Sequence, residues 1–235
     1  VDVSMVKEVI EPIWREKNET ASRVRSRLEK VLGWATVHGY RSGENPARWS
    51  GYLSEIFPKR SAVREVEHHP ALPYAELPAF MQLLEKSNGI GSWVMRFLIL
   101  TATRTTEARA AEWAEFDMEQ KLWEIPAARM KAKRPQRIPL SEAAMEILLE
   151  MKAFNDALAV PSKYVFPGQK QGKHPSEAIM LALLKRIDRK DIVPHGFRAT
   201  FRIFIAEQTT FPREVAEAAL AHAIADKTEA AYQRG

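Results

Sequence analysis

The amino-acid sequence predicts a mainly α-helical protein with a small antiparallel β-sheet, arranged in two domains. Over most of the chain, apolar residues recur at the three- and four-residue spacing of helices. Strand-like runs are short and lie in the middle of the chain, without the regular strand–helix alternation of a nucleotide-binding α/β fold. A stretch with prolines and polar residues at 67–74 interrupts the helices and predicts a linker between the domains.

The first predicted domain spans residues 1–66 and is a helical unit too small to bury a good core alone. We expect a helix over 3–16 and a second helix from an N-cap at Thr20 to about His38. Gly39 and Gly43 end that helix, and residues 45–49 begin another short element. The apolar faces of the two helices are predicted to be Val6, Val9, Ile10, Ile13 and Trp14, and Val24, Leu28, Val31, Leu32 and Ala35.

The second predicted domain spans residues 75–235. Ser141 is the expected N-cap of a helix that runs to about Phe154. Residues 164–166 form a short buried run, and Phe197, Phe201 and Phe204 are expected in the core. Other helices are expected at about 75–87, 90–102, after Arg104, 175–187, 196–208, 212–220 and around Tyr232. Strands are expected near 116–117, 122–125 and 136–140.

Composition narrows the possible classes of protein. An apolar fraction of 46% is ample for a packed core and excludes a disordered chain. The absence of cysteine excludes disulfides and thiolate metal sites, and no glycine-rich phosphate loop or zinc-protease motif is present. No apolar run is long enough to span a bilayer, and no signal peptide is visible. The net charge of +5 and basic clusters fit phosphate neutralisation, although a solvated basic face would look the same.

Two cationic segments are candidates for phosphate chemistry. Arg104 stands where an apolar helix stops, so its planar fork could bind two phosphate oxygens while Glu107 orients it; an ordinary Arg–Glu helix pair is the alternative. Lys131 lies in a predicted hairpin turn, where a lysine could protonate a leaving alkoxide or contact the edges of bases in the minor groove. Lys133 is a rival for that role, and a solvated basic turn is the alternative for both.

The end of the chain carries two histidines, an arginine and a late tyrosine. His195 and Arg198 lie three residues apart at a helix start, where they could share a face, move a proton and clamp a phosphate. His222 follows a helix and could donate to a phosphate oxygen or cap that helix. Tyr232 could be a nucleophile if nearby cations favour its phenolate, or it could be an ordinary packing residue.

Taken together and in this order, these motifs resemble the tyrosine recombinase (phage integrase) family over residues 76–235, and the helical opening resembles its core-binding domain. The finer likeness is to integrases of satellite prophages and genomic islands. It rests on residues 17–25, 45–49, 129–131, 195–200 and 231–234. Thr103 stands where the family usually has glycine. The chain starts at Val1 and stops at Gly235, so we expect a partial core-binding domain and a catalytic domain truncated after the start of the tyrosine helix.

The resemblance implies a role for each matched residue. Arg104 and Arg198 would hold the scissile phosphate, and His222 would bind one of its oxygens. Lys131 would be the general acid for the departing 5′ oxygen, and His195 would assist proton transfer at the nucleophile. Tyr232 would attack and leave a 3′-phosphotyrosyl enzyme, without cofactor, metal or ATP. Contacts to the DNA are expected from Thr20, Ser22, Arg23, Arg25, Arg27, Arg48, Lys133 and Arg134.

The implied function is site-specific integration or excision of a mobile element at double-stranded DNA attachment sites, in the bacterial cytoplasm at the nucleoid. The full-length protein is expected to act as a homotetramer on DNA, with accessory DNA-bending or directionality factors, whereas this fragment could be a monomer. Three alternatives stay open: a type IB topoisomerase-like enzyme that nicks and closes DNA, a non-catalytic DNA-binding integrase remnant, and a helical protein with a basic surface.

Overall fold

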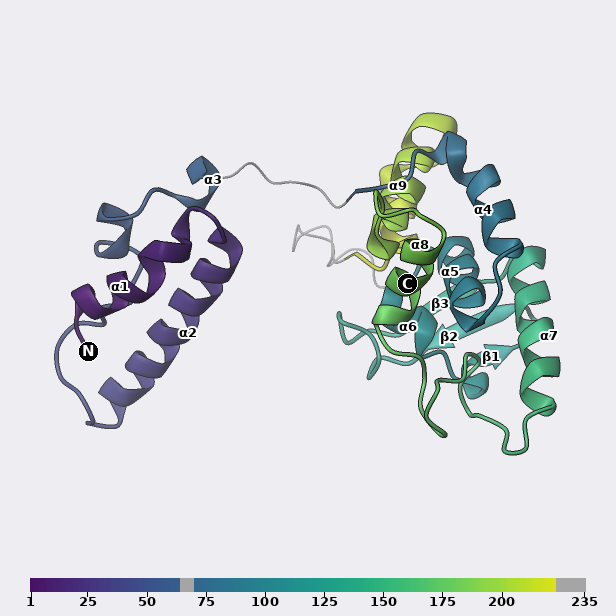
Figure 1. The fold of residues 1–235 in the computed structure, drawn as a ribbon, viewed down its shortest axis with the longest axis horizontal. Coiled ribbons are helices and arrows are strands. Elements are labelled where there is room, and N and C mark those ends of the chain that lie inside the picture. Colours follow the sequence, from purple (N-terminus) through teal and green to yellow (C-terminus); the bar gives the residue numbers. More distant parts are fainter. Residues whose placement is uncertain (64–69, 223–235) are drawn as a thin grey trace. The chain divides into compact units, whose positions relative to one another are not determined.

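The computed structural model describes residues 1–63 and 70–222. The chain divides into two compact units, Val1–His68 and His69–Gly235, which are described separately (Figure 1). The described residues are mainly helical with one three-stranded antiparallel sheet, which confirms the predicted fold class. No described helix is both long enough and apolar enough to cross a membrane.

The first unit is built on two consecutive helices of unequal length, joined by a short turn (Figure 1). Helix α1 (Val3–Trp14) begins at Asp2, whose side chain accepts a hydrogen bond from the Met5 N–H. The prediction of an N-cap at Thr20 was wrong, because the second helix already begins at Asn18. The buried Asn18 side chain instead donates to the Trp14 carbonyl and ties the two helices together. The remaining elements of this unit are α2 (Asn18–Val37), the 3-10 turn η1 (Leu53–Glu55) and α3 (Arg60–Val63).

A small aromatic core holds the first unit together. Trp14 stacks on Trp49 with ring centroids 5.4 Å apart and packs on Phe57 at 4.8 Å. The predicted apolar faces were only partly right, since Val9 is 54% exposed and Val31 is 62% exposed. The buried set consists of Val6, Ile10, Trp14, Ala21, Leu32, Ala47, Leu53 and Phe57.

Residues 45–49 form a turn, and the short element expected there begins only at Leu53. The Asn45 side chain accepts from the Ala47 N–H at 3.0 Å and donates to the Glu29 carbonyl at 2.7 Å. This local hydrogen bonding favours an Asx turn over a helix and fixes the turn against α2.

The second unit contains the small sheet and most of the helices (Figure 1). Its helices are α4 (Leu77–Glu85), α5 (Ile90–Thr101), α6 (Thr105–Arg109), α7 (Glu142–Asp156), α8 (Ala178–Arg186), α9 (Phe197–Gln208) and α10 (Arg213–Ala219). Its 3-10 turns are η2 (Tyr74–Glu76), η3 (Trp113–Glu115) and η4 (Pro194–Gly196). Its strands are β1 (Phe116–Asp117), β2 (Leu122–Ile125) and β3 (Gln136–Pro139), in the order β1-β2-β3.

The sheet is a meander whose second connection is long. Strand β2 pairs antiparallel with β3, with Trp123 opposite Ile138 and Glu124 opposite Arg137. Trp123 and Ile138 are buried, so one face of the sheet closes the core. Residues 126–135 join the two strands as a series of turns, which confirms that Lys131 lies in a hairpin connection.

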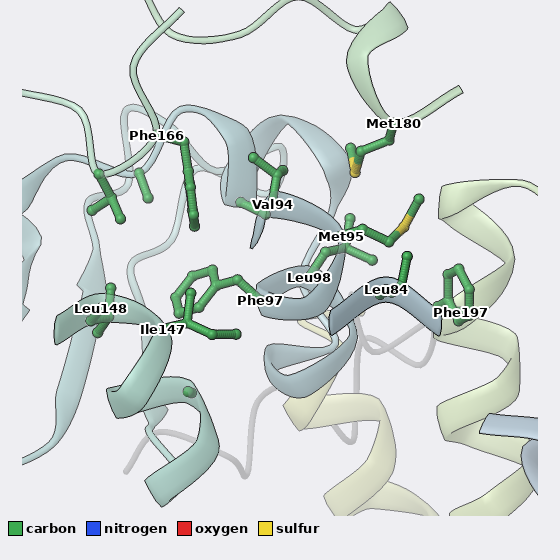
Figure 2. Close-up of a cluster of buried hydrophobic side chains, with 14 of the residues drawn as sticks. Leu84, Val94, Met95, Phe97, Leu98, Ile147, Leu148, Phe166, Met180 and Phe197 are labelled. Atoms are coloured by element: carbon green, nitrogen blue, oxygen red, sulfur yellow. The ribbon is translucent and has the colours of Figure 1, made fainter. Parts of the chain in front are cut away.

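Helix α5 lies at the centre of the core of the second unit (Figure 2). Phe97 points from α5 toward Ile147 of α7 and Phe166, and its ring is 5.2 Å from the Trp123 ring. Because α5 is covered by several elements, its sequence is apolar around most of its circumference. The run at 164–166 is buried as predicted at Val165 and Phe166.

Two predictions for this unit need correction. Phe204 is 42% exposed and meets the Tyr74 ring edge to face, and Phe201 is only half-buried, so of the three predicted phenylalanines only Phe197 belongs to the core. The helix expected to start at 175 starts at Ala178, because Arg109 binds the Pro175 carbonyl at 2.7 Å and holds the preceding residues in a non-helical segment.

Candidate functional site: two arginines at the carboxyl end of helix α10

Arg104 is the N-cap residue of α6 and is fixed by the first turn of that helix. Glu107 Oε2 accepts from the Arg104 backbone N–H at 2.8 Å, and Glu107 Oε1 accepts from Arg104 Nη1 at 2.9 Å. The Glu107 side chain is only 4% exposed, whereas that of Arg104 is 22% exposed. A buried carboxylate therefore orients a guanidinium group that still reaches the surface.

The turn before Arg104 explains why Thr103 can replace glycine. The left-handed backbone conformation belongs to Ala102, with a φ of 50°, and not to Thr103. Thr103 is buried, and its hydroxyl is 2.9 Å from that of Thr101, which in turn donates to the Phe97 carbonyl. This hydroxyl pair fixes the end of α5 just before the arginine.

Arg198 lies in the first turn of α9 and is 5% exposed. Nη1 donates to the Ala102 carbonyl at 2.6 Å, and Nη2 donates to the Leu220 carbonyl at 2.5 Å. Burial, followed by repulsion from Arg104, lowers the pKa of Arg198 to about 10. The group therefore stays a cation at neutral pH, but it is a cation that lacks a neutralising anion of its own among the described residues.

Three elements meet at the carboxyl end of α10. Consecutive carbonyls accept hydrogen bonds there: Ala219 from Gln136 Nε2, Leu220 from Arg198 and Ala221 from Arg104 Nη2, the last at 3.0 Å. Cations are stabilised at this end of a helix dipole. The site thus brings Arg104 and Arg198 together beside the residue that precedes His222.

His222 is joined to a carboxylate of α10. Its Nδ1 lies 2.5 Å from Glu217 Oε2, and Glu217 Oε1 accepts from Arg202 Nε of α9 at 2.7 Å. The hydrogen bond from Arg202, and then that from His222, lowers the pKa of the Glu217 carboxyl. Sequence reasoning missed Glu217 and Arg202, although Glu217 lies five residues before His222 on a short helix that ends between them.

His195 lies in η4, three residues before Arg198, and is exposed while Arg198 is buried. The next residue, Gly196, is needed for close packing, since a Cβ there would lie 2.1 Å from the Pro70 carbonyl oxygen. Thr200 also donates to the Leu72 carbonyl at 2.6 Å. Residues 70–72 are therefore clamped onto the start of α9, which fixes the position of the segment with both His195 and Arg198.

The hairpin cations Lys131, Lys133 and Arg134 are all exposed in the connection between β2 and β3. Lys133 adopts a left-handed backbone conformation with a φ of 54°. Arg129, two residues before Lys131, binds Glu115 and the Glu107 carbonyl. Sequence reasoning did not single out Arg129 or Glu115 as a pair, because fourteen residues separate them along the chain.

The residues expected to bind DNA in the first unit fall into two groups. Arg23 and Arg48 are exposed and each pairs with a glutamate four residues earlier in the chain, and Thr20 and Arg27 are also exposed. Ser22 is half-buried. Arg25 differs, because its side chain is only 16% exposed and binds Glu29 and the Ala47 carbonyl. The contacts of Arg25 therefore serve the packing of this unit.

Tyr232 lies outside the described residues, so the structure does not locate it relative to Arg104 and Arg198. Within residues 1–63 and 70–222, no group of three or more His, Cys, Asp or Glu side chains could hold a metal ion. Of the other candidates, contacts bring Arg104, Glu107, Arg198 and His222 to one place, and Arg129 and Gln136 connect the Lys131 segment to it.

The chain is similar in sequence to integrases of prophages and phages. It is 35% identical over 210 residues to the prophage integrase IntZ of Escherichia coli K12, covering 88% of this chain and 49% of that protein. It is 27% identical over 234 residues to the integrase of Enterobacteria phage P4, covering 92% of this chain and 51% of that protein. The chain thus spans about half the length of these relatives.

The fold is shared with a solved lambda integrase dimer bound to a core site, with a TM-score of 0.69 and 16% identity, covering all of this chain and 80% of that one. Residues 1–52 match the phage integrase central domain, and residues 71–234 match the model of the Phage integrase family. The second unit, with its arginine pair, lies within the second of these matches, and on that evidence the chain belongs to the Phage integrase family.

Proposed function

We propose that this chain is the core of a site-specific DNA recombinase that cuts and rejoins DNA through a 3′-phosphotyrosyl intermediate. The single observation that carries the proposal is the pair of arginines at the end of α10. Arg104 and Arg198 form a fixed, partly buried positive site, in which Arg104 binds the buried Glu107 carboxylate while Arg198 is bound by two backbone carbonyls. A phosphodiester would supply an anion for Arg198 to bind.

The arginines keep the donors that phosphate binding requires. Each guanidinium has five N–H donors, of which contacts among the described residues use two. The remaining donors could bind the non-bridging oxygens of the scissile phosphate and stabilise charge that develops in the transition state. Because packing already fixes both groups, little reorganisation would be needed at the moment of reaction.

The proposed reaction has two balanced steps. The Tyr232 phenolate attacks phosphorus, the bond from phosphorus to the 5′ oxygen breaks, and that oxygen takes a proton from Lys131. His195 accepts the phenol proton, and His222 donates to a phosphate oxygen. In the second step a 5′ hydroxyl from a partner strand gives its proton to Lys131 and attacks the phosphotyrosine. The bond from phosphorus to the tyrosine oxygen breaks, and Tyr232 takes back its proton from His195. Since one phosphoester bond forms for each that breaks, the exchange requires no ATP and no cofactor.

The contact with Glu217 determines which ring nitrogen of His222 can face the phosphate. If Nδ1–H of His222 donates to the carboxylate, only the imidazolium form can donate from Nε2 to a phosphate oxygen. Glu217 is itself held by Arg202. We therefore assign Glu217 as the residue that orients His222.

The proposed partner is double-stranded DNA that carries attachment sites. Relatives with solved structures include a lambda integrase tetramer bound to a Holliday junction, and by this likeness we propose a homotetramer on DNA for the longer protein. Arg23, Arg27 and Arg48 of the first unit, and Lys133 and Arg134 of the second, would contact the sugar–phosphate backbone. Accessory factors that bend DNA or set direction would act on the same assembly.

A covalent trapping experiment tests the proposed function. The chain is incubated with nicked suicide duplexes that carry a randomised core, and the products are separated on a denaturing gel. We expect an adduct of protein with DNA, whose recovered sequences define the attachment core. Tyr232→Phe should abolish the adduct, whereas Tyr40→Phe, an exposed tyrosine in the first unit, should leave it unchanged.

Three outcomes would contradict the proposal. Absence of any adduct across the randomised library would argue against strand cleavage by this chain. An adduct that persists in Tyr232→Phe would assign the nucleophile elsewhere. Relaxation of supercoiled plasmids without any preferred sequence would favour a nicking–closing enzyme over a recombinase.

A further inference from the structure

We propose that Arg129 is a positioning residue that holds the Lys131 segment against the Arg104–Glu107 pair. Its guanidinium group would thereby fix the position of the general acid, Lys131, relative to the phosphate-binding Arg104. The inference rests on the proposed function, because it concerns how Lys131 reaches the leaving 5′ oxygen. It assigns no direct contact between Arg129 and DNA.

The guanidinium group of Arg129 joins two elements of the fold. Nη1 donates to both carboxylate oxygens of Glu115, and Nη2 donates to the Glu107 backbone carbonyl at 2.8 Å. Glu107 is the residue whose carboxylate holds Arg104. The Arg129 side chain therefore links the segment between β2 and β3 to helix α6, which begins after Arg104.

Glu115 provides a fixed anchor for this contact. Its side chain is 8% exposed, and that of Arg129 is 20% exposed. Glu115 Oε2 also accepts from Trp123 Nε1 of β2 at 2.9 Å and from the Glu112 N–H at 3.3 Å. A buried carboxylate with this many donors has little freedom, so the arginine that neutralises it is equally restricted.

The two residues directly before Lys131, Arg129 and Met130, are both held in place. Met130 is 2% exposed and packs in the core, whereas Lys131 is exposed. At the other end of the connection, Gln136 donates to the Ala219 carbonyl beside the arginine site at 2.9 Å. Lys131 directly follows the anchored residues Arg129 and Met130, whereas Lys133 lies two residues farther along, at the end of the turn that its N–H closes on the Met130 carbonyl at 3.1 Å. This placement favours Lys131 over Lys133 as the group with a fixed position.

A lysine cannot replace this arginine at the anchor. A guanidinium group can bind a carboxylate with one nitrogen and a carbonyl with another, whereas an ammonium group is a single point charge. Arg129→Lys keeps a cation beside buried Glu115 and so avoids an unpaired buried carboxylate. It should release the Glu107 carbonyl and loosen the segment before Lys131 without unfolding the unit.

The test compares DNA substrates whose scissile 5′ oxygen is either oxygen or sulfur. A thiolate is a far better leaving group than an alkoxide and needs no general acid, so loss of the acid should matter only for oxygen. Single-turnover cleavage at saturating DNA is measured for wild type, Lys131→Ala, Arg129→Lys and Arg198→Met. We expect Arg129→Lys to cleave the oxygen substrate about tenfold to a hundredfold more slowly than wild type, and the sulfur substrate within about threefold of wild type.

Arg137→Lys is the matched control. Arg137 bridges β2 and β3 of the same hairpin through Glu124 at 2.8 Å, and both side chains are largely exposed, unlike those of Arg129 and Glu115. Its substitution should change neither rate. Glu115→Gln, which removes the anchoring charge but keeps an acceptor for Trp123, should show the same preference for sulfur as Arg129→Lys. Thermal unfolding of each variant identifies any that has lost the fold.

The outcomes separate this inference from the proposed function. If wild type cleaves neither substrate, the proposed function fails. If Lys131→Ala is not rescued by sulfur, the assignment of Lys131 as the acid fails. The inference is overturned if Lys131→Ala is rescued by sulfur but folded Arg129→Lys and Glu115→Gln are not. In that case the two variants are slowed equally on both substrates, or are slowed on neither substrate, and Arg129 does not position the acid.

Discussion

The two units of the chain use arginine in opposite ways. In the first unit, Arg23 and Arg48 are exposed and each pairs with a glutamate four residues earlier in the chain. In the second, Arg104 and Arg198 are held by backbone carbonyls and a buried carboxylate. Surface pairs of the first kind contribute little to stability and exchange readily with phosphate, whereas buried groups are costly to place and difficult to move.

This difference suggests that the arginines of the two units bind DNA in different ways. Exposed arginines suit many weak contacts along a DNA backbone, where counterion release gives affinity that depends on salt. Arg104 and Arg198 suit one phosphate at one place, since hydrogen bonds to carbonyls and to Glu107 fix their orientation before DNA arrives. Arg25 is the exception in the first unit, because it binds the Ala47 carbonyl and belongs with the structural arginines.

The largest expected effect comes from removing a buried arginine. Arg198→Met keeps most of the apolar stem but removes the charge and its hydrogen bonds. We expect cleavage to fall by about a hundredfold to a thousandfold, the range seen when one preorganised donor is lost. Single-turnover cleavage of the suicide duplex measures it. Arg186→Met, which removes a surface arginine bound to the Asn88 carbonyl, should stay within about twofold.

A smaller effect is expected from the acid that holds His222. The pKa of Glu217 lies below its ordinary value of 4.5, chiefly through Arg202. A lowered carboxyl pKa contributes stability that is present above the unfolded pKa and is lost as the pH falls through the folded pKa. Wild type should therefore be more stable than Glu217→Gln at neutral pH, and the difference should shrink as the pH falls below 4.5.

Thermal unfolding of the two proteins across this acidic range measures that difference. A gap in melting temperature that stays constant with pH would argue against an ionised Glu217 as the stabilising partner. Glu214→Gln on the same helix, whose side chain is exposed, serves as the control and should show no such trend.

The smallest effect is expected at the surface of the first unit. Arg23→Gln should weaken DNA binding by less than tenfold and reduce the slope of log affinity against log salt by about one. Fluorescence anisotropy with a labelled duplex over a range of salt concentrations measures the slope. An unchanged slope in Arg23→Gln would remove this arginine from the DNA face. Arg41→Gln, whose side chain binds Thr36 and nearby carbonyls, is the matched comparison and should keep the wild-type slope.

The sequence predicted the local parts of the site better than the contacts between them. Arg104 and Glu107 lie three residues apart, so a helix start was enough to predict their pairing. Arg129 and Glu115 are brought together by the sheet, and Arg198 meets the Leu220 carbonyl only after α9 and α10 pack. Such pairings depend on tertiary contacts that no short pattern encodes.

The errors in the fold have a similar origin. The apolar spacing of α2 predicted burial of Val31, but nothing among the described residues of its unit covers that position. Thr20 had the chemistry of an N-cap, yet the Asn18 side chain bound the preceding helix and moved the helix start forward. In both cases neighbouring elements overruled a correct local preference.

The most direct test of the arginine pair is a substrate whose scissile phosphate carries no charge. If Arg198 acts by neutralising that charge, then cleavage should no longer require Arg198 once one non-bridging oxygen is replaced by a methyl group. Cleavage of this methylphosphonate duplex is measured for wild type and Arg198→Met. Rates that agree within about threefold, against a hundredfold difference on the normal duplex, are the result we predict. An equal loss on both duplexes would contradict the central role of the arginine pair.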